Sequence, residues 1–239
     1  MAEKLSIIIP AYNEEATIEI VLAKVRDMEL LGEVEKELVV VDDASTDRTF
    51  ELVEAFRDGH PDTDFKLLQQ PLNKGKGTAV QRGLQEASGS ILVIQDADLE
   101  YDPRSFNAML EPILNGFADV VYGSRFKGGH PHRMLFFWHS IGNHMLTFFS
   151  NMFCNLNLSD METCYKMVRK ELVDRFELKE KGFGLEPELT AKLAKIPGIR
   201  IYEVGIPYYG RTYAEGKKVG WTDGFRAFWC VLKYNLFSK

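Results

Sequence analysis

The chain contains 239 residues, of which 45% are hydrophobic and 27% are charged, and its formal net charge is −6. This balance is ordinary for a globular protein and excludes collagen-like and intrinsically disordered classes. The negative charge argues against a general nucleic-acid-binding protein, because such proteins need clustered Lys and Arg to neutralise phosphates. The three cysteines (Cys154, Cys164, Cys230) form no C-x-x-C pair, so we expect reduced thiols in an intracellular protein.

Strand and helix patterns alternate along the first 125 residues. Short apolar runs predict strands at 4–10, 36–43, 64–70, 90–98 and 118–125. Helical spacing of apolar residues predicts helices at 13–31, 45–56, 76–88 and 102–114. Ser45 or Thr46 is placed to cap the second of these helices. Strands that are apolar throughout and are separated by helices predict an α/β protein with a mostly parallel central sheet and helices on both faces.

Two later stretches, near 134–153 and 221–237, predict amphipathic helices. The apolar side of the first carries Met134, Trp138, Ile141, Met145, Phe148, Phe149 and Met152. Its opposite side carries Ser140, Asn143, Thr147, Ser150 and Asn151. Because these polar residues and two His interrupt the hydrophobic stretch, we expect no transmembrane helix. Aromatic residues near Lys and Arg fit helices lying in a membrane interface, and packing on the core or a dimer contact is the alternative.

Three acids follow the strand predicted at 90–98: Asp96, Asp98 and Glu100. On an extended segment, Asp96 and Asp98 project to the same side. Two such carboxylates can share one hard divalent cation, Mg²⁺ or Mn²⁺, and leave other positions for phosphate oxygens. A D-x-D pair alone is more often a solvated turn. This pair, however, ends a buried strand, at the edge where parallel sheets bind their ligands.

Eight motifs, in order along nearly the whole chain, carry a resemblance to a known family: "SIIIPAYNEE", "VVVDDASTDRT", "NKGKGTAVQRGL", "QDADLEYDP", "VYGSR", "DMETCYKMVRK", "FGLEPELTAKLA" and "YYGRTYAEGKK". The chain resembles the family 2 inverting glycosyltransferases, and within them the polyprenyl-phosphate enzymes of the dolichyl-phosphate mannose synthase type. The resemblance implies a GT-A nucleotide-binding fold in a single domain, 1–239. Residues 1–125 would form the nucleotide-sugar-binding half, and residues 126–239 the acceptor-side half.

The resemblance also implies a role for each matched position. The nucleotide side of the donor would be bound by Pro10, Ala11, Tyr12, Glu14, Asp42, Asp43 and Lys76. The metal on the donor diphosphate would be held by Asp96, Asp98 and Glu100. Arg211 would close over the diphosphate, and Arg125 and Arg133 would receive the phosphate of the acceptor. The catalytic candidates are Asp98, Arg125, Arg211 and Asp160.

The implied reaction is a metal-dependent, inverting transfer of a hexose from a donor of the GDP-mannose or UDP-glucose type to a dolichyl or undecaprenyl phosphate. We expect a peripheral protein on the cytoplasmic membrane face, with a membrane protein as a further partner to consider. If the acceptor is instead a saccharide or lipid hydroxyl, Asp160 or Glu162 is the candidate base, and Glu186 or Glu188 would bind sugar hydroxyls. A nucleotide-binding module without turnover and a nucleotidyltransferase are the remaining alternatives.

Overall fold

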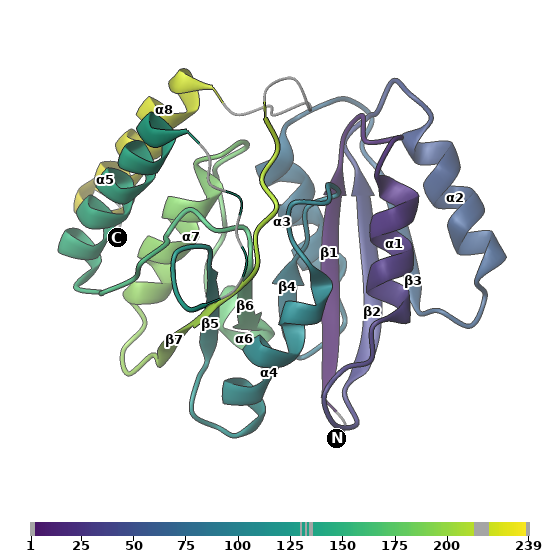
Figure 1. Cartoon of the computed structure of the whole chain (residues 1–239), viewed down its shortest axis with the longest axis horizontal. Helices are drawn as coiled ribbons and strands as arrows, with labels where there is room; N and C mark the ends of the chain where they lie inside the picture. Colours follow the sequence, from purple (N-terminus) through teal and green to yellow (C-terminus); the bar gives the residue numbers. More distant parts are fainter. Residues whose placement is uncertain (1–2, 130, 132, 134–135, 213–219, 238–239) are drawn as a thin grey trace.

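A seven-stranded sheet with the order β3-β2-β1-β4-β6-β5-β7 forms the centre of the protein (Figure 1). The computed structural model describes residues 3–129, 131, 133, 136–212 and 220–237, apart from the side chains at 221 and 222. The first four strands are β1 (Lys4–Ala11), β2 (Glu35–Asp42), β3 (Phe65–Gln69) and β4 (Ile91–Ile94). They pair in parallel, so their carboxyl ends meet at one edge of the sheet.

The remaining strands are β5 (Val120–Ser124), β6 (Lys166–Arg169) and β7 (Ile201–Gly205). β6 lies antiparallel between β4 and β5, while β5 and β7 pair in parallel. The predicted α/β class and mostly parallel sheet are therefore confirmed. β6 and β7 were not predicted, and both come from the second half of the chain, so one sheet contains strands from both halves.

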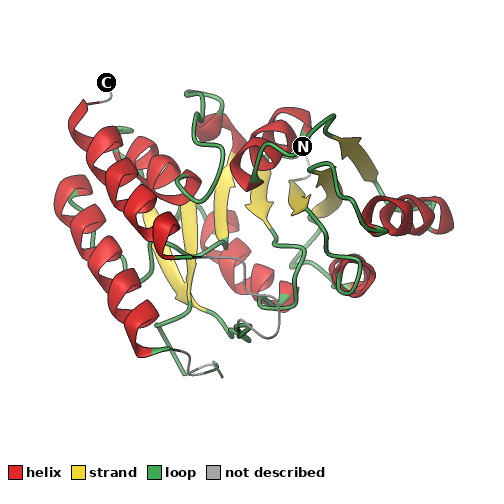
Figure 2. Ribbon diagram, turned by 90° about the horizontal axis from the view of Figure 1, so that it is seen from above, coloured by secondary structure: helices red, strands yellow, loops and turns green. Residues whose placement is uncertain are grey.

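Helices cover both faces of the sheet (Figure 2). They are α1 (Ile18–Asp27), α2 (Thr49–Gly59), α3 (Lys76–Glu86), α4 (Phe106–Leu114), α6 (Lys170–Val173) and α7 (Leu185–Ala194), with a short 3-10 turn at Pro103–Ser105. α3 packs on β1 and β2, and α4 packs on β5. The predicted cap of α2 is wrong. Arg48 occupies the N-cap, Thr49 N donates to Asp47 Oδ1 at 3.0 Å, and the Ser45 hydroxyl instead accepts from Asn13 N.

α5 (Phe137–Cys154) and α8 (Trp221–Leu232) lie side by side at one end of the molecule (Figures 1 and 2). The rings of Phe149 and Phe228 contact each other between the two helices, with their centroids 5.2 Å apart. α8 continues into a π-helical segment, η3 (Lys233–Phe237). Both amphipathic helices were predicted, and positions 134–135 of the first lie outside the described residues.

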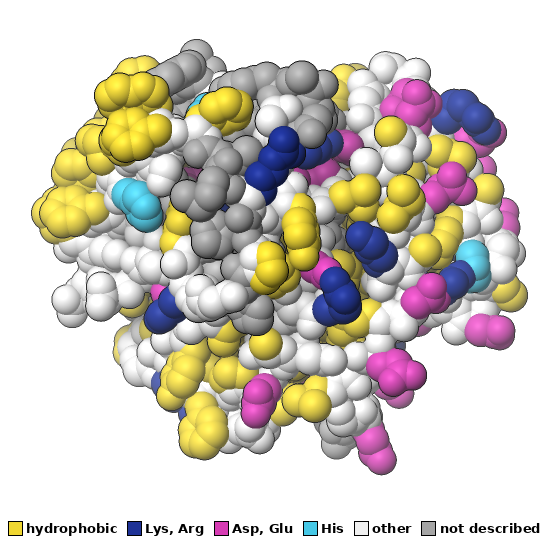
Figure 3. Space-filling view, viewed as in Figure 1, with side chains coloured by type: hydrophobic (Ala, Val, Ile, Leu, Met, Phe, Trp, Pro, Cys, Tyr) yellow, Lys and Arg dark blue, Asp and Glu magenta, His cyan; other side chains and the backbone are white. Residues whose placement is uncertain are grey.

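α5 turns its polar side towards the protein. Thr147 and Ser150 are only 4% and 1% exposed. Some apolar residues of the two helices, such as Phe149, Phe153 and Val231, pack on the core. Five others are each more than half exposed and form what we call the aromatic face: Phe137, Trp138, Phe148, Phe225 and Trp229. Figure 3 shows hydrophobic side chains gathered over these two helices. Among the helices that the structure describes, none combines the length and hydropathy needed to cross a bilayer.

Candidate functional site

A cavity of about 1140 Å³ opens at the carboxyl ends of the parallel strands. Its walls come from the strand ends, from the first turn of α3, and from α5 and α8. Fourteen residues to which the sequence analysis gave a catalytic or binding role line it: Pro10, Ala11, Tyr12, Glu14, Asp43, Lys76, Asp96, Asp98, Glu100, Arg125, Arg133, Glu162, Glu186 and Arg211. Asp42 and Asp160 do not line it. The folded chain therefore gathers one group of predicted residues, distant in sequence, around one space.

Basic side chains pair with the acids that follow β4. Lys76 Nζ lies 2.7 Å from Asp96 Oδ1, and Arg211 Nη2 lies 2.7 Å from Asp98 Oδ2. A second nitrogen of Arg211, Nη1, lies 3.4 Å from Glu14 Oε2. The site thus has an alternating arrangement of carboxylates and cations, which suits an anionic ligand carrying its own counter-ion.

Asp98 is buried between two other acids. Burial and the charges of Asp96 and Glu100 together raise the pKa of Asp98 to about 7, against the opposing charge of Arg211. Asp96, Asp98 and Glu100 supply the hard oxygen donors that Mg²⁺ or Mn²⁺ prefers. Within the described part of the chain, however, no three acidic, Cys or His side chains converge closely enough to hold an ion by themselves. Two carboxylates would therefore need diphosphate oxygens or water to complete such a site.

The loop from Asn73 to Lys76 is held by Asp43 at the end of β2. Its Oδ1 accepts hydrogen bonds from Gln70 Nε2 and Lys74 N, and its Oδ2 accepts from Gly75 N at 2.7 Å. Asp42 faces away from the cavity. Its Oδ2 accepts from Ser45 N at 3.2 Å, and its Oδ1 is buried without a hydrogen-bond partner among the described residues.

Glycine allows α3 to start where it does. Gly75 has a φ of +92°, and a Cβ there would lie 2.5 Å from the carbonyl oxygen of Lys181. A Cβ on Gly77 would lie 2.2 Å from the carbonyl oxygen of Glu180. The backbone of 180–181 therefore lies directly against the first turn of α3, and this close approach places Lys76 beside Asp96.

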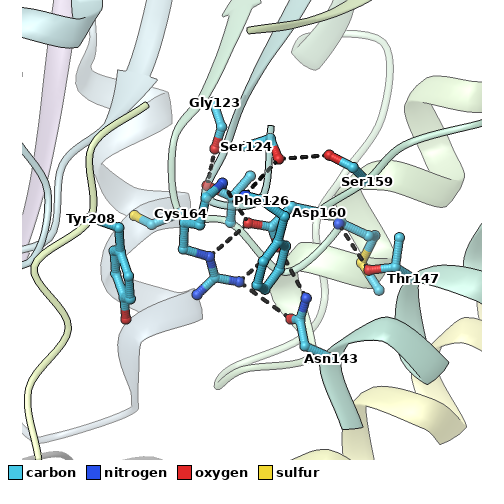
Figure 4. A network of polar contacts seen from close by, with 12 residues as sticks. Gly123, Ser124, Phe126, Asn143, Thr147, Ser159, Asp160, Cys164 and Tyr208 are labelled. Carbon is cyan, nitrogen blue, oxygen red and sulfur yellow. Dashed lines mark hydrogen bonds and ion pairs between the residues drawn. The ribbon is translucent and has the colours of Figure 1, made fainter. Parts of the chain in front are cut away.

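Arg125, at the end of β5, is fixed by a buried acid. Its Nε and Nη2 lie 2.6 and 2.7 Å from the two carboxylate oxygens of Asp160. Asn143 of α5 accepts from Nη2 at 3.3 Å and donates to Asp160 Oδ1 at 3.3 Å (Figure 4). The guanidinium carbon of Arg125 lies over the ring of Tyr208, 5.2 Å from the ring centroid. Burial would raise the pKa of Asp160, but Arg125 and these hydrogen bonds outweigh it and hold the pKa below its usual range.

The segment around Tyr208 forms hydrogen bonds with both Glu100 and Arg133. The Tyr208 hydroxyl donates to Glu100 Oε2 at 2.9 Å, and its carbonyl oxygen accepts from Arg133 N at 2.9 Å. Arg133 Nη1 donates to Gly210 O at 3.1 Å. Arg133 and Arg211 therefore sit on neighbouring segments at the mouth of the cavity.

A second pair of carboxyls, Glu162 and Glu186, lines the floor of the cavity. Each has one buried oxygen without a hydrogen-bond partner among the described residues. Burial and the charge of Glu186 raise the pKa of Glu162 to about 8. Beneath them, the buried Lys166 donates to the Thr163 carbonyl and lies over the Tyr122 ring at 5.2 Å. The sequence reading missed Lys166, although a lysine within the short apolar run "CYKMV" was a usable signal.

The comparisons with known proteins agree on one family. Residues 6–176 match the model of glycosyl transferase family 2. A dolichol-phosphate mannosyltransferase of Pyrococcus furiosus is 32% identical over 90% of this chain, and this chain spans only 60% of that protein's length. An undecaprenyl-phosphate mannosyltransferase of Micrococcus luteus is 29% identical, over 89% of this chain and 86% of that protein.

Solved structures support the fold. A glucosyl-3-phosphoglycerate synthase of Mycobacterium tuberculosis, solved with Mn²⁺, uridine diphosphate and phosphoglyceric acid, superposes with a TM-score of 0.73 at 21% identity. The match covers 98% of this chain and 79% of that one. The sheet thus has the GT-A arrangement, and the match over residues 6–176 shows that this chain belongs to glycosyl transferase family 2.

Proposed function

We propose that the protein transfers a hexose, with inversion, from a nucleotide diphosphate sugar to a polyprenyl phosphate at a membrane surface on its cytoplasmic side. The observation that carries this proposal is the cavity, which is lined by the acids that follow β4, by three arginines and by residues of α5 and α8. The names of the Pyrococcus and Micrococcus relatives support a lipid phosphate as acceptor.

The donor half of the cavity has the charges that a diphosphate needs. Asp96 and Asp98 would hold a divalent ion together with diphosphate oxygens. When bound, that ion stabilises the charge that develops on the departing diphosphate. Arg211, which lies beside Asp98, would assist, since a guanidinium forms paired hydrogen bonds with phosphate oxygens. Pro10, Ala11 and Tyr12 would border the nucleotide.

A phosphate acceptor simplifies the chemistry. The bond between the anomeric carbon and the diphosphate oxygen breaks, and a bond from that carbon to an acceptor phosphate oxygen forms. A phosphate monoester has a second pKa near 6, so at neutral pH it is largely a dianion and needs no base. Arg125 and Arg133, which also line the cavity, would orient it. The burial of Asp160 beneath Arg125 supports a positioning role for this acid, and not that of a base.

The aromatic face would bring the protein to its lipid acceptor. Trp138 of α5 and Trp229 of α8 are 65% and 57% exposed, and apolar side chains of this size favour the membrane interface. Replacing both with Ser should weaken sedimentation with anionic vesicles by about tenfold or more. Tyr202 of β7, which is 45% exposed, provides the control, because its replacement with Ser should leave sedimentation unchanged. Equal binding of all three proteins would refute this attachment.

A thermal-shift series with nucleotide sugars, with and without Mn²⁺, tests the donor site. A ligand at about 100 times its dissociation constant stabilises the folded state by about 2.7 kcal/mol. Asp98→Asn should abolish the Mn²⁺-dependent part of the shift, while Asp102→Asn, in the same loop but outside the cavity lining, should keep it. An unchanged shift in Asp98→Asn would remove Asp98 from the site. No shift with any nucleotide sugar in the wild type would refute the proposed function.

One observation favours a hydroxyl acceptor as the second candidate. Glu162 lines the cavity and has a pKa raised to about 8, and a carboxyl in that position could accept a proton from a hydroxyl. Glu162→Gln separates the two candidates. It should leave transfer to a polyprenyl phosphate largely intact, but it should abolish transfer if a hydroxyl is the acceptor.

A further inference from the structure

Asn143 lies where the inward polar side of α5 meets the arginine at the end of β5. The helix contacts the protein through apolar side chains and through polar groups. Thr147 Oγ1 accepts from Met161 N at 3.2 Å, and Asn151 bonds both the N–H and the carbonyl of Leu158 at 3.0 and 2.8 Å. The inward side of α5 therefore follows the backbone of residues 158–161, the segment that carries Asp160.

The contacts of Arg125 leave one part of its guanidinium for a ligand. Nε and Nη2 bond the two oxygens of Asp160, which is completely buried. Asn143 bridges this pair, because its amide oxygen accepts from Arg125 Nη2 and its amide nitrogen donates to Asp160 Oδ1. Neither Asp160 nor Asn143 contacts Nη1, and the guanidinium has a further polar contact with the Tyr208 side chain. Arg125 lines the cavity, so the part of the guanidinium that does not face Asp160 could meet a phosphate oxygen there.

We infer that Asn143 is a positioning residue for the acceptor phosphate, which it serves by holding the guanidinium of Arg125 in one orientation. This inference rests on the proposed function. Without the amide, Asp160 still pairs with Arg125, but Nη2 loses its second partner and the guanidinium gains freedom to pivot. Because the outer side of the same helix carries Trp138 and Phe148, the amide also fixes the position of the phosphate-binding arginine relative to the aromatic face.

The test compares Asn143→Ala with Asn151→Ala. Asn151 lies on the same side of the same helix and also makes two hydrogen bonds, but it does not touch Arg125. Asn143→Ala should raise the KM for the acceptor by about tenfold, the effect expected from losing a hydrogen bond to a charged group, with little change in kcat. The increase should be the same for a polyprenyl phosphate in vesicles and for a short, water-soluble alkyl phosphate. Asn151→Ala should lower the melting temperature and leave both KM values unchanged.

A double-mutant cycle distinguishes positioning from a general structural effect. In an Arg125→Lys background, which keeps a cation beside Asp160, Asn143→Ala should raise the acceptor KM no further. Additive effects, or the same KM in Asn143→Ala as in the wild type, would overturn the inference. If Asn143→Ala does not fold, Asn143→Ser is subject to the same two criteria. A wild-type protein that transfers sugar to no lipid phosphate would refute the proposed function itself, which is a different outcome.

Discussion

The side chain of Glu180 joins α8 and η3 to the rest of the protein. Replacing Glu180 with Gln tests how much these contacts contribute to the free energy of unfolding. Its Oε1 accepts from Lys233 Nζ and the Tyr234 hydroxyl, both at 2.8 Å, and its Oε2 accepts from Arg226 Nη2 at 3.1 Å. Burial alone would raise the pKa of Glu180, but these hydrogen bonds outweigh it and lower the pKa from 4.5 to about 2. A difference of this size corresponds to roughly 3 kcal/mol of stability at neutral pH.

We therefore expect Glu180→Gln to lower the free energy of unfolding by about 2–3 kcal/mol at pH 7. The expected loss extends below 3 kcal/mol because Arg226 and Lys233 are about half exposed, so solvent screens their charges. Since the pKa is lower in the folded state, the contribution of Glu180 is complete above its unfolded pKa and disappears as the pH falls towards 2. The difference between wild type and variant should shrink by roughly 1.4 kcal/mol per pH unit below about 4.5.

Urea denaturation at a series of pH values measures this difference directly. The exposed Glu171, at the start of α6, supplies a matched control: Glu171→Gln should change the free energy of unfolding by less than about 0.5 kcal/mol. A loss below about 0.5 kcal/mol for Glu180→Gln at pH 7 would contradict the calculation. So would a loss that stays constant as the pH falls from 7 to 3, because it could not come from the charge of the carboxylate.

Two further changes test the packing and the charge of the site. Gly77→Ala would place a methyl group 2.2 Å from the carbonyl oxygen of Glu180, so it should destabilise the protein by about 1–3 kcal/mol, whereas Gly142→Ala, with open space around it, should not. Thermal unfolding compares the two. Because the pKa of Glu162 is raised to about 8, its contribution to stability is complete below its unfolded pKa and is lost as the pH rises through 8. Glu162→Gln should therefore gain stability relative to wild type as the pH rises from about 5 to about 8, and a difference that stays constant over that range would contradict this.

Four of the five strands that the sequence predicted, β1, β2, β4 and β5, are largely buried, and the fifth, the edge strand β3, is partly exposed. β1 and β4 are apolar over most of their length, and β2 contains the apolar run 38–41, as a strand covered by helices on both sides must. β6 escaped prediction because two of its four residues are charged. Lys166 is buried there only because Glu162 and Glu186 lie nearby in the folded chain, and no local pattern contains that information.

The candidate site, like the fold, could be predicted from the sequence only in part. Acids and small polar residues at the ends of consecutive strands could be predicted to meet, because parallel strands end at one edge of the sheet. The partner of Arg125 could not, because Asp160 follows it by 35 residues and joins it only through the placement of the segment after α5. From the sequence, Asp160 is a free acid and therefore a candidate base. In the fold it is a buried counter-ion that does not reach the cavity.

The amphipathic pattern of α5 identified two sides of the helix but not which one faces the protein. Periodicity alone favours burying the apolar side, because that removes most hydrophobic surface from water. α5 buries a mixed side. Leu146, Phe149 and Phe153 pack on the core, and the polar residues beside them find partners in Arg125, Asp160 and the backbone at 158–161, so their burial leaves these groups hydrogen-bonded. The aromatic side chains that remain outside then require an apolar surrounding for the arrangement to be favourable overall. A bilayer provides that surrounding and also contains the proposed acceptor, so one helix would serve both attachment and substrate binding.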